Sequence, residues 1–274
     1  MRGSRSRIFW RSDLNLAATI WLGTALAAAA LVSGCEGSVG VGVDATAADA
    51  ASDDGAGPGD AGPDLATAGC RPGAGATGAP GSISEAVELA NSLPRPVSLA
   101  CFLESLTRPL YAVATSNIVS LQPAVGSRSP RVLLVSDRLI MTLVPAGTGS
   151  HTIELGEFVT ALRTLKAELG FPLVQALAPP DPFERIRDPR GGTTCRGCHR
   201  DEAPVEEIGY AMAFTSGAIR PHFRNQVELE SLRAERDRCD DAIEPDRCAI
   251  LRALFDHGPV LPRDLPASVP TIFD

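Results

Sequence analysis

The chain has 274 residues, of which 44% are hydrophobic and 21% charged, and its formal net charge is −8 at pH 7. A chain of this length can bury a hydrophobic core of ordinary size. The acidic balance, without any stripe of basic residues, argues against a nucleic-acid partner, because no surface would neutralise the phosphates. Seven cysteines are spread from residue 35 to residue 248.

Residues 1–34 have the pattern of a targeting segment. Four arginines within the first twelve residues precede an apolar run, Leu16–Val32, which is typical of a secretory signal peptide. The run ends in Leu-Val-Ser-Gly-Cys at residues 31–35, and this sequence resembles the bacterial lipobox. The resemblance implies cleavage before Cys35 and lipidation of its thiol. A non-cleaved membrane anchor is the alternative, and either one tethers the chain to a membrane.

The residue after the lipobox cysteine bears on the location of the protein. It is Glu36, and not the aspartate that, by the same resemblance, retains some lipoproteins in the inner membrane. We therefore expect a protein of the bacterial cell envelope, lipid-anchored through Cys35, at the outer membrane or the periplasmic face. Several acyl chains on one cysteine suffice for stable anchoring.

Residues 35–80 predict an acidic linker. The segment consists mainly of Ala, Gly, Asp, Pro and Thr and has no aromatic residue. Such a composition cannot bury enough apolar surface to offset the entropy of ordering, so we expect disorder. The linker would act as a flexible spacer between the membrane and a folded body.

Residues 81–178 predict an α+β region with a small antiparallel β meander. Ser82 and Glu85 form a capping box before a helix over 84–93, and a second short helix is expected at 101–106. Apolar runs separated by turn residues then indicate strands. The runs are apolar on both faces, so we expect helices to cover the sheet on one side. They span residues 111–119, 131–135, 139–144 and 151–155.

A further helix is predicted over residues 158–169, with Gly170 as its C-terminal stop. Its apolar residues recur at helical spacing; they are Phe158, Val159, Leu162, Leu165 and Leu169. A Pro-rich connector follows and leads into an exposed loop at Gly191 and Gly192.

The sequence Cys195-Arg196-Gly197-Cys198-His199 has the C-x-x-C-H spacing of covalent haem attachment. Two thiols at this spacing can reach two vinyl groups on one porphyrin edge, and the adjoining histidine can bind the iron. On these five residues the chain resembles c-type cytochromes. The resemblance implies haem c held by Cys195 and Cys198, with His199 as the proximal ligand. It also implies attachment outside the cytoplasm, which suits an exported chain.

Three other interpretations of the same two cysteines stay open. They can form a C-x-x-C disulfide, or half of a zinc site, although no second C-x-x-C or H-x-x-x-H accompanies them. They can also be a relic that binds nothing. The acidic residues that follow, Glu202, Glu206 and Glu207, are predicted to form a solvated face.

The second axial ligand of the iron has two candidates, Met212 and His222. Met212 follows His199 by thirteen residues, which is closer than the resemblance to mono-haem cytochromes implies, and core packing is its alternative role. His222 would give bis-histidine ligation, and a surface imidazole is its alternative. An open or water-bound sixth position is also compatible with the sequence. We expect His257, which ends a predicted helix, to be structural, and nothing in the sequence assigns a role to His151, which opens a predicted strand.

Residues 179–274 predict a mainly helical region around the motif. A charged segment at 228–239 and an apolar stripe at 245–255 indicate two helices joined by a turn. With Cys35, Cys195 and Cys198 assigned, four cysteines remain, and three pairings are possible. We prefer the pairs that are closest in sequence, which are Cys239–Cys248 and Cys70–Cys101.

These patterns together predict a lipid-anchored, exported α+β protein that carries one haem and passes single electrons to another redox protein. We expect a carrier and not a catalyst. The rival interpretation is a non-redox binding or structural lipoprotein with Cys195–Cys198 as a disulfide, since a minimal electron carrier does not need the β meander. A third is a haem enzyme with an open sixth position, for which no acid/base pair is recognisable.

Overall fold

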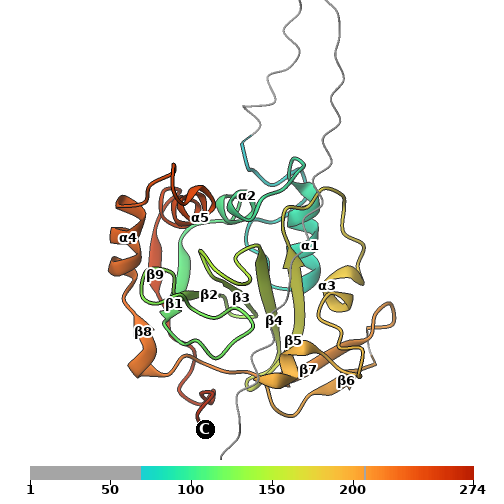
Figure 1. Cartoon of the computed structure of the whole chain (residues 1–274). Helices are drawn as coiled ribbons and strands as arrows, with labels where there is room; N and C mark the ends of the chain where they lie inside the picture. The colour runs from blue at the N-terminus through green and yellow to red at the C-terminus, as the bar shows by residue number, and fades with distance from the viewer. Residues whose placement is uncertain (1–68, 207) are drawn as a thin grey trace, which may run out of the picture. The chain divides into compact units, whose positions relative to one another are not determined.

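The computed structural model describes residues 69–206 and 208–274. Their centre is one nine-stranded sheet (Figure 1), in which the order is β6-β7-β5-β4-β3-β2-β1-β8 and β9 pairs with β1. The β1–β9 pair is parallel, whereas the other pairs are antiparallel. The fold is mixed and the sheet dominates it. The predicted signal peptide, Cys35 and residues 35–68 of the linker lie outside the described residues.

The strands vary widely in length. A long β4–β5 hairpin lies at the middle of the sheet, and short strands from the last third of the chain extend both edges. The bounds are β1 Leu110–Thr115, β2 Arg131–Val135, β3 Leu139–Leu143, β4 Thr152–Thr160, β5 Arg163–Gly170, β6 Ala203–Val205, β7 Ala213–Gly217, β8 Gln226–Val227 and β9 Val260–Pro262.

The α-helices of the described chain are short. The predicted N-cap of the first helix is confirmed, because the Glu85 amide donates to the Ser82 hydroxyl. The reciprocal bond of a capping box is displaced by one residue: the Glu85 carboxylate accepts from the Gly81 amide and not from the Ser82 amide. Within the same residues, no helix has the length and hydropathy needed to cross a membrane. The bounds are α1 Ile83–Ser92, α2 Leu99–Glu104, α3 Asp181–Glu184, α4 Leu229–Asp237 and α5 Pro245–Phe255.

The two faces of the sheet differ in chemistry because side chains alternate along each strand. We call the first the core face; it packs against α1, α2 and α5 and is apolar throughout, with Leu134, Met141 and Ile153 among its buried residues. We call the other the cavity face. Its apolar cluster is smaller, and it also carries polar side chains, among them Arg131, Thr142, Glu154, Thr164 and Lys166. Helices thus cover one side of the sheet, as predicted.

The predicted helix over 158–169 is wrong. Residues 152–160 and 163–170 form the β4–β5 hairpin, with Phe158 paired to Thr164 and a register shift next to Thr160. Two of the apolar residues that recur at helical spacing, Leu165 and Leu169, also fall on alternating positions of β5, where they face the core together with Ala167. The sequence fits both a helical repeat and the alternation of a strand, and pairing with neighbouring strands stabilises the strand.

The prediction of a mainly helical C-terminal region is also wrong. The helices α4 and α5 are present as predicted, but β6, β7, β8 and β9 join the sheet that residues 110–170 begin. Pairing of β7 with β5 and of β9 with β1 places this part of the chain at both edges of the sheet. The meander is therefore the middle of a larger sheet.

Both predicted disulfides, Cys70–Cys101 and Cys239–Cys248, are confirmed. The first ties the segment before α1 to α2, and the second ties the end of α4 to the first turn of α5. By the chain-entropy model, loops of these lengths contribute about 3.5 and about 2.5 kcal/mol respectively.

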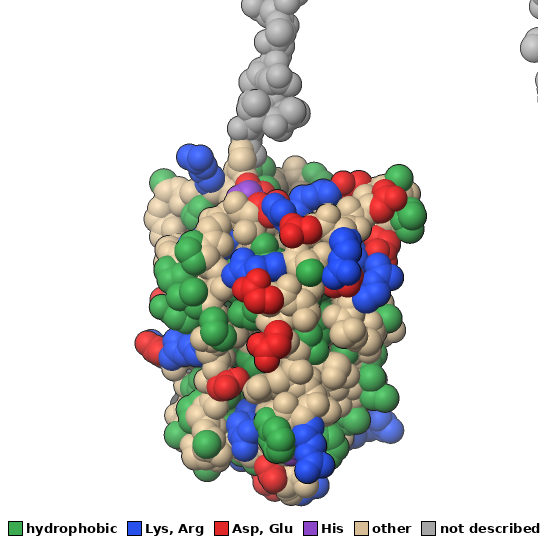
Figure 2. Space-filling view, turned by 90° about the vertical axis from the view of Figure 1, so that its left-hand side faces the viewer, with side chains coloured by type: hydrophobic (Ala, Val, Ile, Leu, Met, Phe, Trp, Pro, Cys, Tyr) green, Lys and Arg blue, Asp and Glu red, His purple; other side chains and the backbone are tan. Residues whose placement is uncertain are grey.

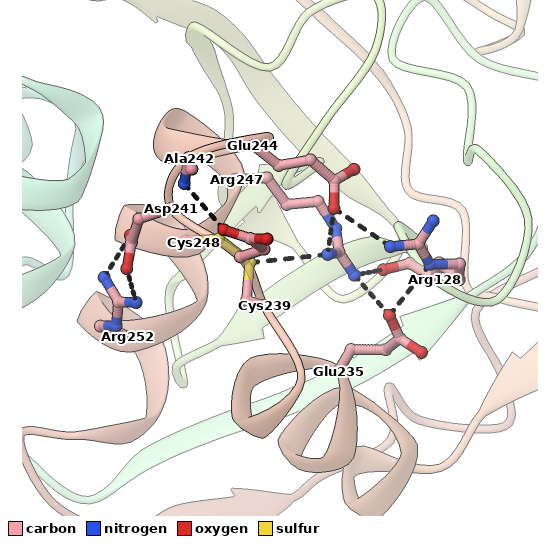
Figure 3. Close-up of a disulfide and its surroundings, with 10 residues drawn as sticks. Arg128, Glu235, Cys239, Asp241, Ala242, Glu244, Arg247, Cys248 and Arg252 are labelled. Carbon is pink, nitrogen blue, oxygen red and sulfur yellow. Dashed lines mark hydrogen bonds and ion pairs between the residues drawn. A yellow bond between two sulfur atoms is a disulfide. The ribbon is translucent and has the colours of Figure 1, made fainter.

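Arg247, beside the second disulfide, is the centre of an ion-pair network. Its side chain is 4% exposed and donates to Glu235 at 2.7 Å, to Glu244 at 3.1 Å and to the Arg128 carbonyl at 2.7 Å (Figure 3). On the molecular face that carries α4, charges of both signs are interspersed (Figure 2). The network joins α4, α5 and the loop before β2.

We predict that Arg247→Met lowers the free energy of unfolding by about 2 kcal/mol, because the change leaves Glu235 without its buried partner. The matched control is Arg252→Met: Arg252 pairs with Asp241 on the surface of the same helix pair, and an exposed pair contributes less than about 1 kcal/mol. Urea unfolding of both variants measures the difference. Equal losses would contradict the role given to the network.

Candidate functional site

The C-x-x-C-H motif lies against the cavity face of the sheet. Cys195, Cys198 and His199 line a cavity together with side chains from β1 to β5 and residues 218–221. The pairing of β5 with β7 sets this arrangement, because Thr164 lies opposite Ser216 and Arg163 opposite Gly217. The cavity measures about 90 Å³, room for a molecule of a few non-hydrogen atoms.

A carboxylate before the motif holds its loop closed. Asp188 accepts from the Arg190 amide at 2.9 Å, from the Arg190 side chain, and from Arg196 inside the motif at 3.2 Å. Hydrogen bonds from Arg190 lower the pKa of Asp188 to about 2. Gly191 and Gly192 turn the chain with φ of 97° and 73°, a region that favours glycine.

A second carboxylate holds the loop from the other side. Glu202 accepts from both the backbone amide and the hydroxyl of Thr193, and the Thr193 hydroxyl in turn accepts from the Cys195 amide at 3.2 Å. The prediction that Glu202 belongs to a solvated face is therefore wrong. Glu206 is exposed, as predicted, and Glu207 lies outside the described residues.

The ring of His199 is oriented by a backbone carbonyl. Its Nδ1 lies 2.8 Å from the Gly217 oxygen, so we assign the proton to Nδ1, because a lone pair there would face the carbonyl lone pairs. Burial, with the nearby Lys166 charge, lowers the pKa of His199 to about 3. The ring is neutral at pH 7, and its second nitrogen, Nε2, keeps a lone pair for a ligand.

Lys166 is buried in the same place. Its side chain projects from β5 into the cavity, the residue is 8% exposed, and its Nζ lies 3.3 Å from His199 Nδ1. Burial lowers the pKa of Lys166 to about 8, partly offset by Cys195 and Glu154. A protein ammonium this deep is costly unless an anion accompanies it.

The two motif thiols are unpaired within the described chain, where the other four cysteines form disulfides. Burial raises the pKa of Cys195, and Lys166 opposes that effect. Cys195 is thus a protonated thiol at neutral pH, unlike the low-pKa cysteines of thiol–disulfide enzymes.

The two candidate distal ligands lie elsewhere. Met212 is 58% exposed just before β7, and His222 stacks against Phe223 and Phe273; neither residue lines the cavity. His257 follows α5, with its Nδ1 3.9 Å from the Glu104 carboxylate. His151 lies in the turn before β4.

One feature of the sequence distinguishes Lys166 from the other basic residues and could have marked it as a candidate site residue. It is the only lysine of the chain, in which every other basic side chain is an arginine. A chain that otherwise uses arginine exclusively places its one ammonium in this cavity. Lysine, unlike arginine, shifts its pKa readily on burial.

Comparison with protein-family models, curated proteins and solved structures found no match. Within residues 69–206 and 208–274, no three or more His, Cys, Asp or Glu side chains are grouped as metal ligands. The zinc interpretation of the motif needs two further ligands of this kind. Among the described side chains, Cys195 and Cys198 have no such further ligands beside them.

We predict that acid loosens the motif loop through Asp188. A carboxylate with a lowered pKa stabilises the native state above its unfolded pKa of about 3.8, and this contribution is lost as the pH falls towards 2. The protection factors of residues 188–199, which correct hydrogen exchange for its intrinsic pH dependence, should therefore fall between pH 4 and pH 2. Asp188→Asn should show the weak protection already at pH 7, whereas Asp201→Asn, at an exposed acid just past the motif, should not. Unchanged exchange in Asp188→Asn would contradict the role of this carboxylate.

We predict that Lys166→Met raises the free energy of unfolding at pH 7, by about 1–3 kcal/mol, in buffer free of phosphate and carboxylates, because it removes a buried charge at similar volume. The folded pKa of about 8 lies below the unfolded value, so wild-type stability rises with pH between about 8 and 10.4. The advantage of the variant should shrink over that range. Urea unfolding at pH 7 and pH 10.5 measures both effects, and a less stable variant at pH 7 would contradict them.

Proposed function

We propose that this chain is an exported, lipid-anchored, mono-haem protein similar to c-type cytochromes, which carries single electrons. Haem c would be attached through Cys195 and Cys198, with His199 as the proximal ligand of the iron. The lipid on Cys35 would hold the protein at the bacterial cell envelope, at the outer membrane or the periplasmic face, and a second redox protein would exchange electrons with it.

The observation that carries the proposal is the state of the three motif side chains. Both thiols are unpaired in the described chain although its other four cysteines are oxidised. The histidine beside them donates through Nδ1 to the Gly217 carbonyl, and metal-binding histidines usually donate their other ring N–H to an acceptor of this kind. That contact fixes the tautomer that leaves Nε2 free to bind iron.

The donor set suits the cofactor, but the cavity is small. Cofactor sites usually measure roughly 300–1,000 Å³, against about 90 Å³ here. Haem in this cavity would therefore require segments that line it to move apart. Residues 218–221 are among the segments that line the cavity.

The contributions of the chain itself follow from its geometry. Cys195 and Cys198 would hold the porphyrin: each thiol would add across one vinyl double bond, forming a C–S bond while the thiol hydrogen passes to the adjacent vinyl carbon. The bound iron supplies reversible one-electron chemistry. The Gly217 carbonyl raises the basicity of His199, and the Asp188 and Glu202 contacts hold the loop that presents the thiols.

The test is to export the chain from a host with haem-maturation machinery and to stain a denaturing gel for haem. We expect haem that survives denaturation and a Soret band in the absorption spectrum. The double variant Cys195→Ser, Cys198→Ser should lose the covalent haem. The matched control is the double variant Cys239→Ser, Cys248→Ser, which also removes two cysteines but should keep it.

Absence of haem, under conditions that mature a control cytochrome, would reject the proposal. The chain would then be a non-redox envelope lipoprotein, and a disulfide between Cys195 and Cys198 in the exported protein would support that rival.

A further inference from the structure

Three hydrogen-bond donors around the cavity lack acceptors. Thr164, 1% exposed, has a buried hydroxyl without a partner in the described chain, and the same holds for Nε of Arg131. Both residues line the cavity. Lys166 is the third donor, two residues from Thr164 on the same face of β5. Buried polar atoms without partners are rare and call for an explanation.

The one hydrogen-bond contact of the Lys166 ammonium within the described residues does not give it an acceptor. His199 Nδ1, at 3.3 Å, already holds the proton that it donates to the Gly217 oxygen. A donor cannot also accept, so within the described residues Lys166 has no acceptor for its three N–H groups. An acceptor that is not part of the described protein is therefore missing from this place.

The charges that face the cavity favour an anion. Arg131, Lys166 and Arg220 line it, against the single carboxylate of Glu154. Glu154 is paired with Arg131, and Arg220 donates through Nε to the Val269 carbonyl at 2.7 Å. The formal balance is thus positive, and the neutral His199 does not change it.

We infer that this cavity binds a small oxyanion, such as phosphate or a short carboxylate, through Lys166, Thr164 and Nε of Arg131. An oxyanion offers several acceptor lone pairs to converging donors, and one of a few non-hydrogen atoms matches the cavity volume. The inference does not rest on the haem proposal, because the three donors belong to the sheet and not to the motif.

The test uses the full exported chain prepared without haem-maturation machinery, with its haem content measured on the same sample. Sodium phosphate and sodium acetate are titrated at constant ionic strength against sodium chloride. We expect a saturable rise of the thermal midpoint with phosphate or acetate and not with chloride. Because Lys166 is the only lysine, its labelling by an amine-reactive reagent can be read from the mass of the peptide that contains it, separately from any reaction at the α-amino group. The bound anion should slow this labelling several-fold.

Single substitutions test which side chains bind the anion. Lys166→Met should abolish the midpoint shift, and Thr164→Val should weaken the apparent affinity by about ten-fold, as expected for one hydrogen bond to a charged group. Ser216→Ala is the matched control: its hydroxyl is also buried without a partner among the described residues, directly opposite Thr164 on β7, but it does not line the cavity. This control should bind like wild type.

Three results would overturn the inference. They are no saturable response of the haem-free chain to either anion, retention of the response in Lys166→Met, or an equal loss in Ser216→Ala and Thr164→Val. The first result is also the one expected if the donors of the cavity bind only the propionate groups of an attached haem and no free anion. Failure of haem attachment leaves all of these measurements unaffected.

Discussion

The pairing of β7 with β5 is the constraint on which the site depends. It joins the last third of the chain to the central hairpin and sets Ser216 and Gly217 opposite Thr164 and Arg163. The Gly217 carbonyl then lies within hydrogen-bond distance of His199, and the motif is brought against the face from which Lys166 projects. Without this pairing, the five motif residues would be a loop with no sheet behind it.

The two faces of the sheet have different roles: the core face stabilises the fold, and the cavity face carries the polar groups of the candidate site. Its core face is covered by α1, α2 and α5 with an apolar interior, which supplies the hydrophobic stabilisation of the fold. The cavity face can therefore hold buried polar groups that cost stability, including the ammonium of Lys166 and the unpartnered hydroxyl of Thr164. Buried, perturbed groups gathered in a cavity are candidates for function on physical grounds.

Much of the local structure could be predicted from the sequence, and the long-range pairing could not. The N-cap at Ser82 and the pairs Cys239–Cys248 and Cys70–Cys101 rest on short-range signals and are confirmed. Residues 158–169 of the β4–β5 hairpin predict a helix because the turn, Thr160–Arg163, contains neither Gly nor Pro and the apolar residues fit both the helical and the strand period. Strands as short as β6 and β8 carry too few residues to show a period. The motif was recognisable from spacing, but Glu202 and Lys166 become part of the site only through tertiary contacts.

The central claim is that Cys195 and Cys198 carry a porphyrin. Intact-mass and peptide mass spectrometry of the exported chain, from a host that matures c-type haem, tests it most directly. The account predicts a mass increase of one haem, located on the peptide that contains Cys195, Cys198 and His199. The same peptide found with free thiols, or with a disulfide between the two cysteines, would contradict the claim.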